Sequence, residues 1–319
     1  MAQTGIVLDL CQRAFPDWSF AIKVIKTTGD KLQAVDLTNP NQELPKGLFT
    51  KEIEEALLSG AADIAVHSLK DLPTELPAGL VLAAVLPRED VRDVLIYRAP
   101  DPSSPLRGFA PHLRLMDLPV AATLGTGSPR REVQLKASRP DLRVVPIRGN
   151  VGTRLHKLAT QPNLDAIVLA LAGLRRLGLR MDASGNLNIP AGPVGDRDEP
   201  LPEHLMATPL PFETMLPCVG QGAIAIEARV RDDLTTALCA RLNHRETMQC
   251  ISAERAFLRA MGGGCQSPVA ALASIESGQL RLRAVSFEGS QPRRGEDRRS
   301  VQEADALGKL VAAQLKAQP

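Results

Sequence analysis

Aromatic side chains and long apolar runs are both scarce in this chain. Phe, Trp and Tyr together make up 3% of the 319 residues, which argues against a surface that binds nucleic acid by stacking bases on aromatic rings. No run approaches the roughly 20 apolar residues of a membrane span. The first residues also lack the basic, apolar and small-residue order of a secretion signal. We therefore expect a cytoplasmic protein with no membrane partner.

An excess of one charge sign is absent as well. The sequence has 38 Lys and Arg against 36 Asp and Glu, a formal charge of +2, so no nucleic-acid partner is expected. The five cysteines and five histidines show no metal-ligand spacing, and no metal site is predicted. Cysteines that are odd in number and lack a Cys-x-x-Cys pair indicate free thiols in a reducing compartment.

The stretch Ala62–Asp71 is the first candidate site. Its apolar residues Ile64–Val66 predict a strand buried in a parallel sheet, set off from the preceding helix by Gly60. Its polar residues follow that strand, at the edge where open α/β sheets bind ligands. They are His67, Ser68, Lys70 and Asp71. A solvated turn with one Lys-Asp pair is the plainer alternative.

The middle third repeats a strand, a turn and a helix three times, and each turn carries arginines. The strands are expected over residues 119–123, 143–147 and 165–170. They are followed by Arg130 and Arg131, by Arg148–Arg154, and by Gly173–Gly178. Convergent arginine forks suit a small polyanion, and the absence of a complete nucleotide-binding fingerprint favours carboxylates over phosphates. Taken singly, each arginine is also compatible with a solvated helix start.

Periodicity predicts most of the other elements. Helices are expected over residues 3–14, 48–58, 232–242, 245–261 and 301–313. Strands are expected over residues 20–25, 81–86, 223–227, 269–275 and 279–287. Residues 180–217 are rich in proline and predict a long loop. Gly262–Gly264 should leave the thiol of Cys265 accessible, so a reactive cysteine is one hypothesis for that position.

Several long motifs, in order over nearly the whole chain, resemble those of the porphobilinogen deaminase family, also called hydroxymethylbilane synthase. They are Lys26-Thr-Thr-Gly-Asp30, Lys46-Gly-Leu-Phe-Thr-Lys-Glu52, Val66-His-Ser-Leu-Lys-Asp71, Pro87-Arg-Glu-Asp90, Arg130-Arg131, Arg148-Gly-Asn-Val-Gly-Thr-Arg154, Gly220-Gln-Gly222 and Gly263-Gly-Cys-Gln266. The resemblance implies an α/β protein with two doubly wound lobes, like those of solute-binding proteins, and a small α+β C-terminal domain. We expect a catalytic lobe from residues 1–88 and 223–240, an arginine-rich lobe from 91–217, and a cofactor-attachment domain from 244–319.

The same resemblance implies the roles of the site residues. Cys265 matches the cysteine that holds a dipyrromethane cofactor by a thioether, and Asp71 matches the catalytic carboxylate, which also binds the cofactor. The other expected cofactor-binding residues are Ser68, Lys70, Arg130, Arg131, Arg148 and Arg154. The expected substrate-binding residues are Lys46, Arg148, Arg154 and Arg176.

The implied reaction joins four porphobilinogen molecules, with loss of ammonia, into linear hydroxymethylbilane on the dipyrromethane primer. Such a transferase acts in the biosynthesis of tetrapyrroles such as haem and chlorophyll, and we expect a monomer. Asp71 would stabilise the cationic azafulvene that forms when ammonia departs. A transport receptor or sensor built from similar lobes is one alternative, but the lack of a secretion signal and the glycine-set Cys265 argue against it. An inactive or truncated relative that binds pyrrole carboxylates without turnover stays open.

The chain departs from this family at its amino terminus. Family members begin with a strand that carries an Arg-x-Ser signature, whereas Met1–Thr4 aligns with the body of the helix that follows it. We expect this first strand to be missing, as in a shortened reading of a longer protein or in a defective one. Residues 22–25 and 64–66 should then flank a gap or close directly on each other, with lower stability and activity than in a longer form.

Overall fold

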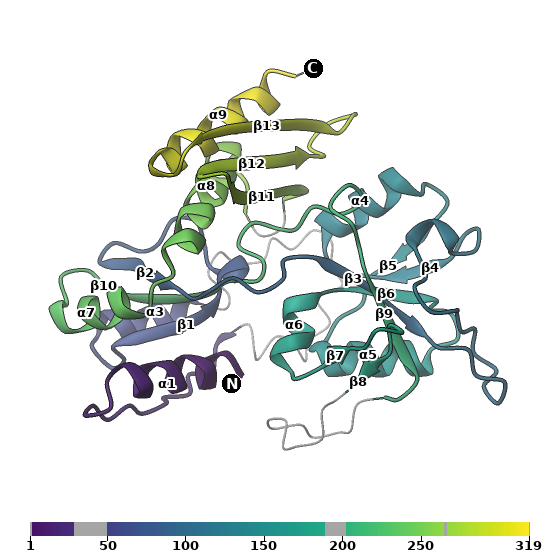
Figure 1. The fold of residues 1–319 in the computed structure, drawn as a ribbon, viewed down its shortest axis with the longest axis horizontal. Helices are drawn as coiled ribbons and strands as arrows, with labels where there is room; N and C mark the ends of the chain where they lie inside the picture. Colours follow the sequence, from purple (N-terminus) through teal and green to yellow (C-terminus); the bar gives the residue numbers. More distant parts are fainter. Residues whose placement is uncertain (1, 29–49, 189–201, 265–266, 319) are drawn as a thin grey trace.

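The computed structural model describes residues 2–28, 50–188, 202–264 and 267–318. Its elements form three units, each built on one β-sheet (Figure 1). The first and second units lie side by side, and the third, which ends the chain, lies above them in this view. This mixed α/β architecture with a small C-terminal unit agrees with the expected fold class.

The first unit has a three-stranded sheet with the order β1-β10-β2, in which both pairs are antiparallel. Its strands and helices are β1 (Ile64–Ser68), β2 (Leu80–Val85), β10 (Ile224–Arg229), α1 (Ala2–Ala14), α3 (Lys51–Leu58) and α7 (Asp233–Leu242). Helices α1 and α7 pack on one face, where Val7 and Leu238 share a core with Ile226, whereas α3 packs on the other face through Leu57. The expectation that β1 lies in a parallel sheet is therefore wrong, because β10 returns from the second unit and pairs with β1 in the opposite direction.

The strand expected over residues 20–25 is also wrong. These residues form no β-ladder, and the side chains of Ile22 and Val24 are 39% and 66% exposed. Lys23 Nζ donates a hydrogen bond to the carbonyl oxygen of Ala61 at 3.1 Å. An apolar alternation becomes a strand only when a pairing partner is available. Within the described residues, β1 pairs with β10 alone, so direct closure of residues 22–25 on β1 does not occur.

The second unit has a five-stranded sheet with the order β5-β4-β6-β3-β9. Its strands are β3 (Asp93–Arg98), β4 (Thr123–Gly125), β5 (Arg143–Val145), β6 (Ala166–Ala170) and β9 (Leu205–Pro209), and its helices are α4 (Pro129–Ser138), α5 (Val151–Thr160) and α6 (Leu171–Arg176). The strands β5, β4 and β6 run parallel, whereas β3 is antiparallel to both of its neighbours. Helix α4 covers one face, and α5 and α6 cover the other.

The segment expected as a continuous loop over residues 180–217 contributes β9 to this sheet, together with a small ribbon of β7 (Arg180–Met181) and β8 (Leu187–Asn188). The loop prediction is therefore wrong at these positions. Residues 189–201, which hold part of the proline-rich sequence, lie outside the described residues.

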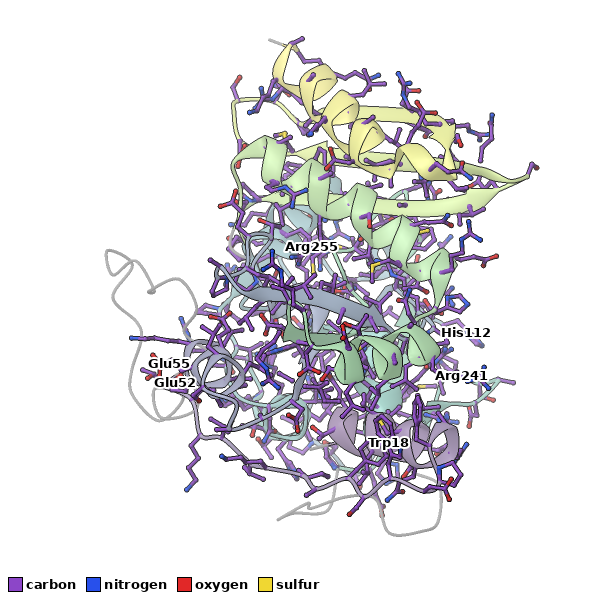
Figure 2. The ribbon with its side chains drawn as sticks, turned by 90° about the vertical axis from the view of Figure 1, so that its left-hand side faces the viewer. Trp18, Glu52, Glu55, His112, Arg241 and Arg255 are labelled. Atoms are coloured by element: carbon purple, nitrogen blue, oxygen red, sulfur yellow. The ribbon has the colours of Figure 1, made fainter. Side chains whose placement is uncertain are left out.

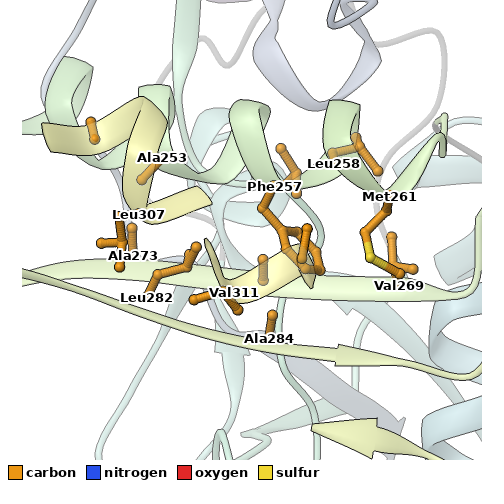
Figure 3. Close-up of a cluster of buried hydrophobic side chains, with 14 of the residues drawn as sticks. Ala253, Phe257, Leu258, Met261, Val269, Ala273, Leu282, Ala284, Leu307 and Val311 are labelled. Atoms are coloured by element: carbon orange, nitrogen blue, oxygen red, sulfur yellow. The ribbon is translucent and has the colours of Figure 1, made fainter. Parts of the chain in front are cut away.

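The third unit packs two helices against one face of an antiparallel sheet. Its elements are α8 (Arg245–Met261), β11 (Val269–Glu276), β12 (Gln279–Ser286), β13 (Arg293–Ser300) and α9 (Ala304–Lys316). Phe257, Leu282 and Val311 meet in its core (Figure 3). A Cβ atom on Gly308 would lie 2.4 Å from the carbonyl oxygen of Ala253, so α9 rests directly on the backbone of α8.

The chain crosses between the first and second units twice, and the two crossings are hydrogen-bonded to each other. Leu86 N donates to Ile224 O at 3.0 Å, and Glu89 N donates to Gly222 O at 3.1 Å. Gly222 has a φ of +86°, and a Cβ atom there would lie 2.6 Å from the carbonyl oxygen of Glu89. Only glycine fits this position, where the backbones touch. None of the described helices has the length and apolar character needed to cross a membrane.

Candidate active site

Asp71 lies on a short, well-anchored turn at the end of β1. The turn is the 3₁₀ helix η1 (Leu69–Asp71), and the Leu69 side chain is buried beneath it. Leu69 N donates to Ala223 O at 3.1 Å. Beyond the turn, Arg255 of α8 donates to the carbonyl oxygen of Pro73 at 2.7 Å (Figure 2). These contacts fix the backbone on both sides of Asp71, whose side chain is exposed.

Arginines of the second unit come near one another and near Asp71. Burial lowers the pKa of Arg176, while Glu89 and Asp71 oppose that change, so Arg176 and Asp71 are within electrostatic range. Burial also lowers the pKa of Arg154, and the neighbouring charges of Arg131 and Arg148 lower it further. A lowered arginine pKa indicates a cation without enough nearby negative charge. This region therefore suits an anion with several carboxylates.

Cys218 lies close to charged residues of both units. It precedes the second crossing, and it lies within electrostatic range of Lys70 and Asp71 from the first unit and of Arg130 and Asp93 from the second. Burial raises the pKa of its thiol. Lys70 and Asp71 of the first unit and Arg130 of the expected arginine set thus lie around one position.

Arg130 and Arg131 have inward contacts that the sequence did not indicate. The guanidinium of each pairs with the buried carboxylate of Asp93, through Arg130 Nη2 at 2.7 Å and Arg131 Nη2 at 2.9 Å. Arg131 also donates through Nη1 to Val168 O at 3.0 Å. The Nε of Arg130 has no hydrogen-bond partner among the described residues. Arg130 thus keeps a buried donor that an anionic ligand would satisfy.

Ser68 and His67 both have partners within the first unit. Gln3 of α1 donates to the hydroxyl of Ser68 at 2.6 Å, on the face of β1 that α1 covers. His67 lies on the opposite face, where its Nε2 is 3.0 Å from a carboxylate oxygen of the fully buried Glu227. The predicted positions of Lys46 and Cys265 lie outside the described residues. Among the residues that are described, no group of His, Cys, Asp and Glu could hold a metal ion.

Asp93 and Gln221 are site residues whose part in the arginine cluster the sequence analysis missed. Gln221 donates through Nε2 to Asp93 Oδ1 at 2.9 Å and to Val91 O at 2.8 Å. The available signal for Asp93 was its place before Val94–Tyr97, since a charged residue directly before a fully apolar run needs buried partners. For Gln221, the flanking glycines of the Gly-Gln-Gly motif marked a tight backbone without indicating what the amide binds.

Comparisons with known proteins agree over nearly the whole chain. The family model described as "Porphobilinogen deaminase, dipyromethane cofactor binding domain" matches residues 1–237, and "Porphobilinogen deaminase, C-terminal domain" matches residues 248–317. The porphobilinogen deaminase of Syntrophomonas wolfei is 44% identical over 315 residues, which cover 98% of this chain and 90% of the relative. That of Moorella thermoacetica is 41% identical over 98% of this chain and 88% of the relative. That of Thermus thermophilus is 43% identical over 97% and 89%, respectively.

Proposed function

The chain belongs to the porphobilinogen deaminase family, and from this membership we propose how its residues share the work of the family's reaction. The enzyme is a transferase that joins four porphobilinogen molecules, with loss of ammonia, into hydroxymethylbilane, with a dipyrromethane cofactor as primer. This activity excludes the interpretation as a transport receptor. The interpretation as a non-catalytic relative is less favoured than that of an active enzyme. The proposal depends on one observation: Asp71 and Arg176 are within electrostatic range, although they come from different units.

Asp71 is the proposed catalytic residue. When ammonia leaves porphobilinogen, positive charge develops on the pyrrole, and a fixed carboxylate beside it lowers the energy of that charge. The rigid turn supports this role, because Leu69 and Arg255 hold the backbone in place and little reorganisation is needed. Lys70, half-buried on the same turn, is proposed to bind a carboxylate of the cofactor.

The arginines are proposed to bind and orient carboxylates. Each pyrrole unit carries two carboxylates, so a chain that grows on the enzyme needs several cationic partners. Arg148, Arg154 and Arg176 are the proposed substrate ligands, with Lys46 as a further one from the sequence motif. The lowered pKa values of Arg154 and Arg176 support this, since an arriving carboxylate would favour the charged guanidinium and so offset the burial at both residues and the repulsion at Arg154. Holding the reacting carbons in position contributes to the rate as orientation.

The residues that the structure describes fit a dipyrromethane group. The orphaned Nε of buried Arg130 and the uncompensated charge at Arg154 match a ligand that brings carboxylates. We propose that Arg130, Arg131, Arg148, Arg154, Lys70, Ser68 and Asp71 bind this group and that Cys265 carries it. Bound there, it supplies the first pyrrole carbon to which substrate is added. For Ser68 the proposal requires that its hydroxyl exchange the bond with Gln3 for one to the ligand.

We also propose the domain limits, location and assembly state expected above. Residues 1–88 with 223–240, 91–217 and 244–319 would form the catalytic, arginine-rich and cofactor-attachment domains. Sheet β1-β10-β2, sheet β5-β4-β6-β3-β9 and sheet β11-β12-β13 fall within these limits and support them. A cytoplasmic monomer is proposed from the sequence, and size-exclusion chromatography with light scattering tests the monomer.

Intact mass spectrometry tests the cofactor anchor. Protein purified from a haem-making host should exceed the mass of the bare polypeptide by one dipyrromethane. Cys265→Ser should remove that excess, whereas Cys11→Ser, which changes a buried thiol of α1, should keep it. Wild-type protein at the bare mass, or an adduct that survives in Cys265→Ser, would refute Cys265 as the anchor.

A further inference from the structure

Three side chains from two separate segments bind Asp93. Its carboxylate, fully buried at the start of β3, accepts hydrogen bonds from Arg131 of α4 and from Gln221 of the second crossing, and it forms an ion pair with Arg130 of α4. Burial by itself raises the pKa of a carboxyl, but the two arginines outweigh it and lower the pKa of Asp93. The group is therefore ionised at neutral pH, with two cations against one anion.

The two arginines differ in how many of their N–H donors are already bound. Arg131 donates through all three of its nitrogens, through Nε and Nη2 to Asp93 and through Nη1 to Val168 O. Arg130 binds Asp93 through Nη2 and Leu216 O through Nη1, and its Nε has no partner among the described residues. All three guanidinium nitrogens of Arg131 thus already donate within the protein, so Arg131 must exchange one of these bonds to bind the cofactor, whereas Arg130 keeps one unbound donor. The two adjacent arginines therefore differ in the donors that they can offer a ligand.

Gln221 connects this cluster to the crossings between the units. Its side-chain Nε2 donates to both Asp93 Oδ1 and Val91 O. Its backbone carbonyl oxygen accepts a hydrogen bond from Arg88 Nε at 2.9 Å. Val91 and Arg88 belong to the first crossing, and Gln221 belongs to the second. Any movement of one crossing against the other therefore changes the hydrogen bonding of Asp93.

We propose that Asp93 is a positioning residue that orients Arg130 toward pyrrole carboxylates, and that Gln221 couples this orientation to the two crossings. The inference rests on the proposed function, because it places Arg130 in the carboxylate site. Arg131 offsets the charge of Asp93 and is itself held in place by its hydrogen bond to Val168 O. The cluster thereby links the relative placement of the lobes to the affinity for the growing chain.

The sharpest test replaces Gln221 with Glu. Above the pKa of the new carboxyl, two carboxylates would face each other where an amide had donated, and one carboxyl of such a pair has a strongly raised pKa. At lower pH the protonated Glu donates to Asp93 as the amide did. The charged and titratable groups in contact with the Gln221 side chain are Asp93 and Cys218, and Arg88 contacts its backbone.

We expect kcat/KM of Gln221→Glu, divided by that of wild type, to rise about tenfold or more as pH falls from about 8.5 to about 6.5. Most of the change should come from KM, because Arg130 binds carboxylates and does not react. Gln221→Leu, which cannot donate at any pH, should give a low ratio that is flat with pH. A flat ratio in Gln221→Glu as well would overturn the coupling, since a purely structural loss has no reason to reverse with pH.

Asp93→Asn tests the positioning role with a readout besides activity. The fraction of protein that carries dipyrromethane, measured by intact mass, should fall, and KM for porphobilinogen should rise at least about tenfold, as expected when a buried charge pair loses one partner. Asp165→Asn is the matched control, because Asp165 accepts from Thr123 N and Arg107 in the same sheet but lies outside the cluster. Unchanged occupancy and KM in folded Asp93→Asn would overturn the inference.

Two further outcomes separate this inference from the proposed function. If Asp93→Asn fails to fold, the pH profile of Gln221→Glu decides alone. Wild-type KM and occupancy in Arg130→Ala would overturn the proposed role of Arg130 itself. A severe defect in Arg130→Ala beside silent Gln221 and Asp93 variants would overturn only the positioning by Asp93.

Discussion

The guanidinium of Arg88 and the carboxylate of Glu254 are joined by two hydrogen bonds, from Nη1 to Oε1 at 2.6 Å and from Nη2 to Oε2 at 3.0 Å. The same carboxylate accepts the backbone N–H groups of Gly220 and Ala273, each at 2.9 Å. Arg88 lies on the first crossing, Gly220 on the second, and Glu254 and Ala273 in the third unit. One fully buried side chain thus ties all three units together.

Glu254→Gln should lower the free energy of unfolding by about 3–5 kcal/mol, because it leaves the charge of Arg88 without its partner. Urea unfolding followed by circular dichroism measures the change. Glu296→Gln is the control, because Glu296 pairs with Arg281 on the exposed face of the third sheet, and such pairs contribute about 1 kcal/mol or less. Equal losses in both variants would contradict the role assigned to Glu254.

Asp71→Asn should keep the fold and the covalent cofactor but lower kcat by about 100-fold or more, because the amide has the shape of the carboxylate without its charge. Steady-state kinetics with porphobilinogen measures the loss. Asp63→Asn should stay near wild type, since Asp63 is exposed at the other end of β1 and pairs there with Arg229. A wild-type kcat in Asp71→Asn would place the catalytic centre elsewhere.

Arg148→Lys should raise KM for porphobilinogen about tenfold, because a point charge cannot replace a bidentate fork. The matched change Arg143→Lys alters an exposed arginine of β5 and should leave KM unchanged. Both variants keep their charge, so a difference between them reports on geometry. Equal KM values would remove Arg148 from the binding site.

The stability of the first unit should depend on Glu54. Burial raises the pKa of Glu54 and the charge of Glu227 raises it further, against opposing effects of Thr50 and His67. The pKa of Glu54 is thus higher in the folded state than in the unfolded state. The stability that its protonated carboxyl contributes is complete below the unfolded pKa of about 4.3 and is lost as pH rises through the folded pKa. Glu54→Gln removes the cost of ionising this group.

We therefore expect Glu54→Gln to raise Tm by about 2–4 °C at pH 8, the shift that about 1 kcal/mol produces, and by less at pH 4.5. Differential scanning fluorimetry at the two pH values measures it. Glu55→Gln changes the exposed neighbour on α3 (Figure 2) and should shift Tm equally at both. A gain that is larger at pH 4.5 would have the wrong sign.

Helices were the best predicted part of the fold, because their patterns are local. The limits 245–261 expected from periodicity are those of α8, and α1 differs from its expected range by a single residue at the start. Strand β13 escaped prediction because Arg293–Ser300 has no apolar alternation, and its pairing with β12 stabilises it instead. The false strand over residues 20–25 is the converse case, since a favourable pattern found no partner there.

The site could be predicted by residue type but not by contact. Clustered arginines at strand ends predicted a carboxylate site, and of these Arg130 lies with Asp71 within electrostatic range of Cys218. The division of labour between Arg130 and Arg131 depends on Asp93, which is 37 residues earlier than Arg130 in the sequence and adjacent only after β3 pairs with β6. No local pattern carries such a relationship. The direction of Ser68 toward Gln3 likewise depends on how α1 docks.

The order β1-β10-β2 also has a consequence for synthesis on the ribosome. The second sheet has its last strand, β9, once residue 209 has been made, whereas the first sheet lacks its central strand until residue 229. Strands β1 and β2 are among the earliest made, yet β10 is the strand that pairs with both. The lobe that begins the chain is thus the later of the two to be completed. While the arginine-rich lobe forms, β1 and β2 have not yet paired with β10.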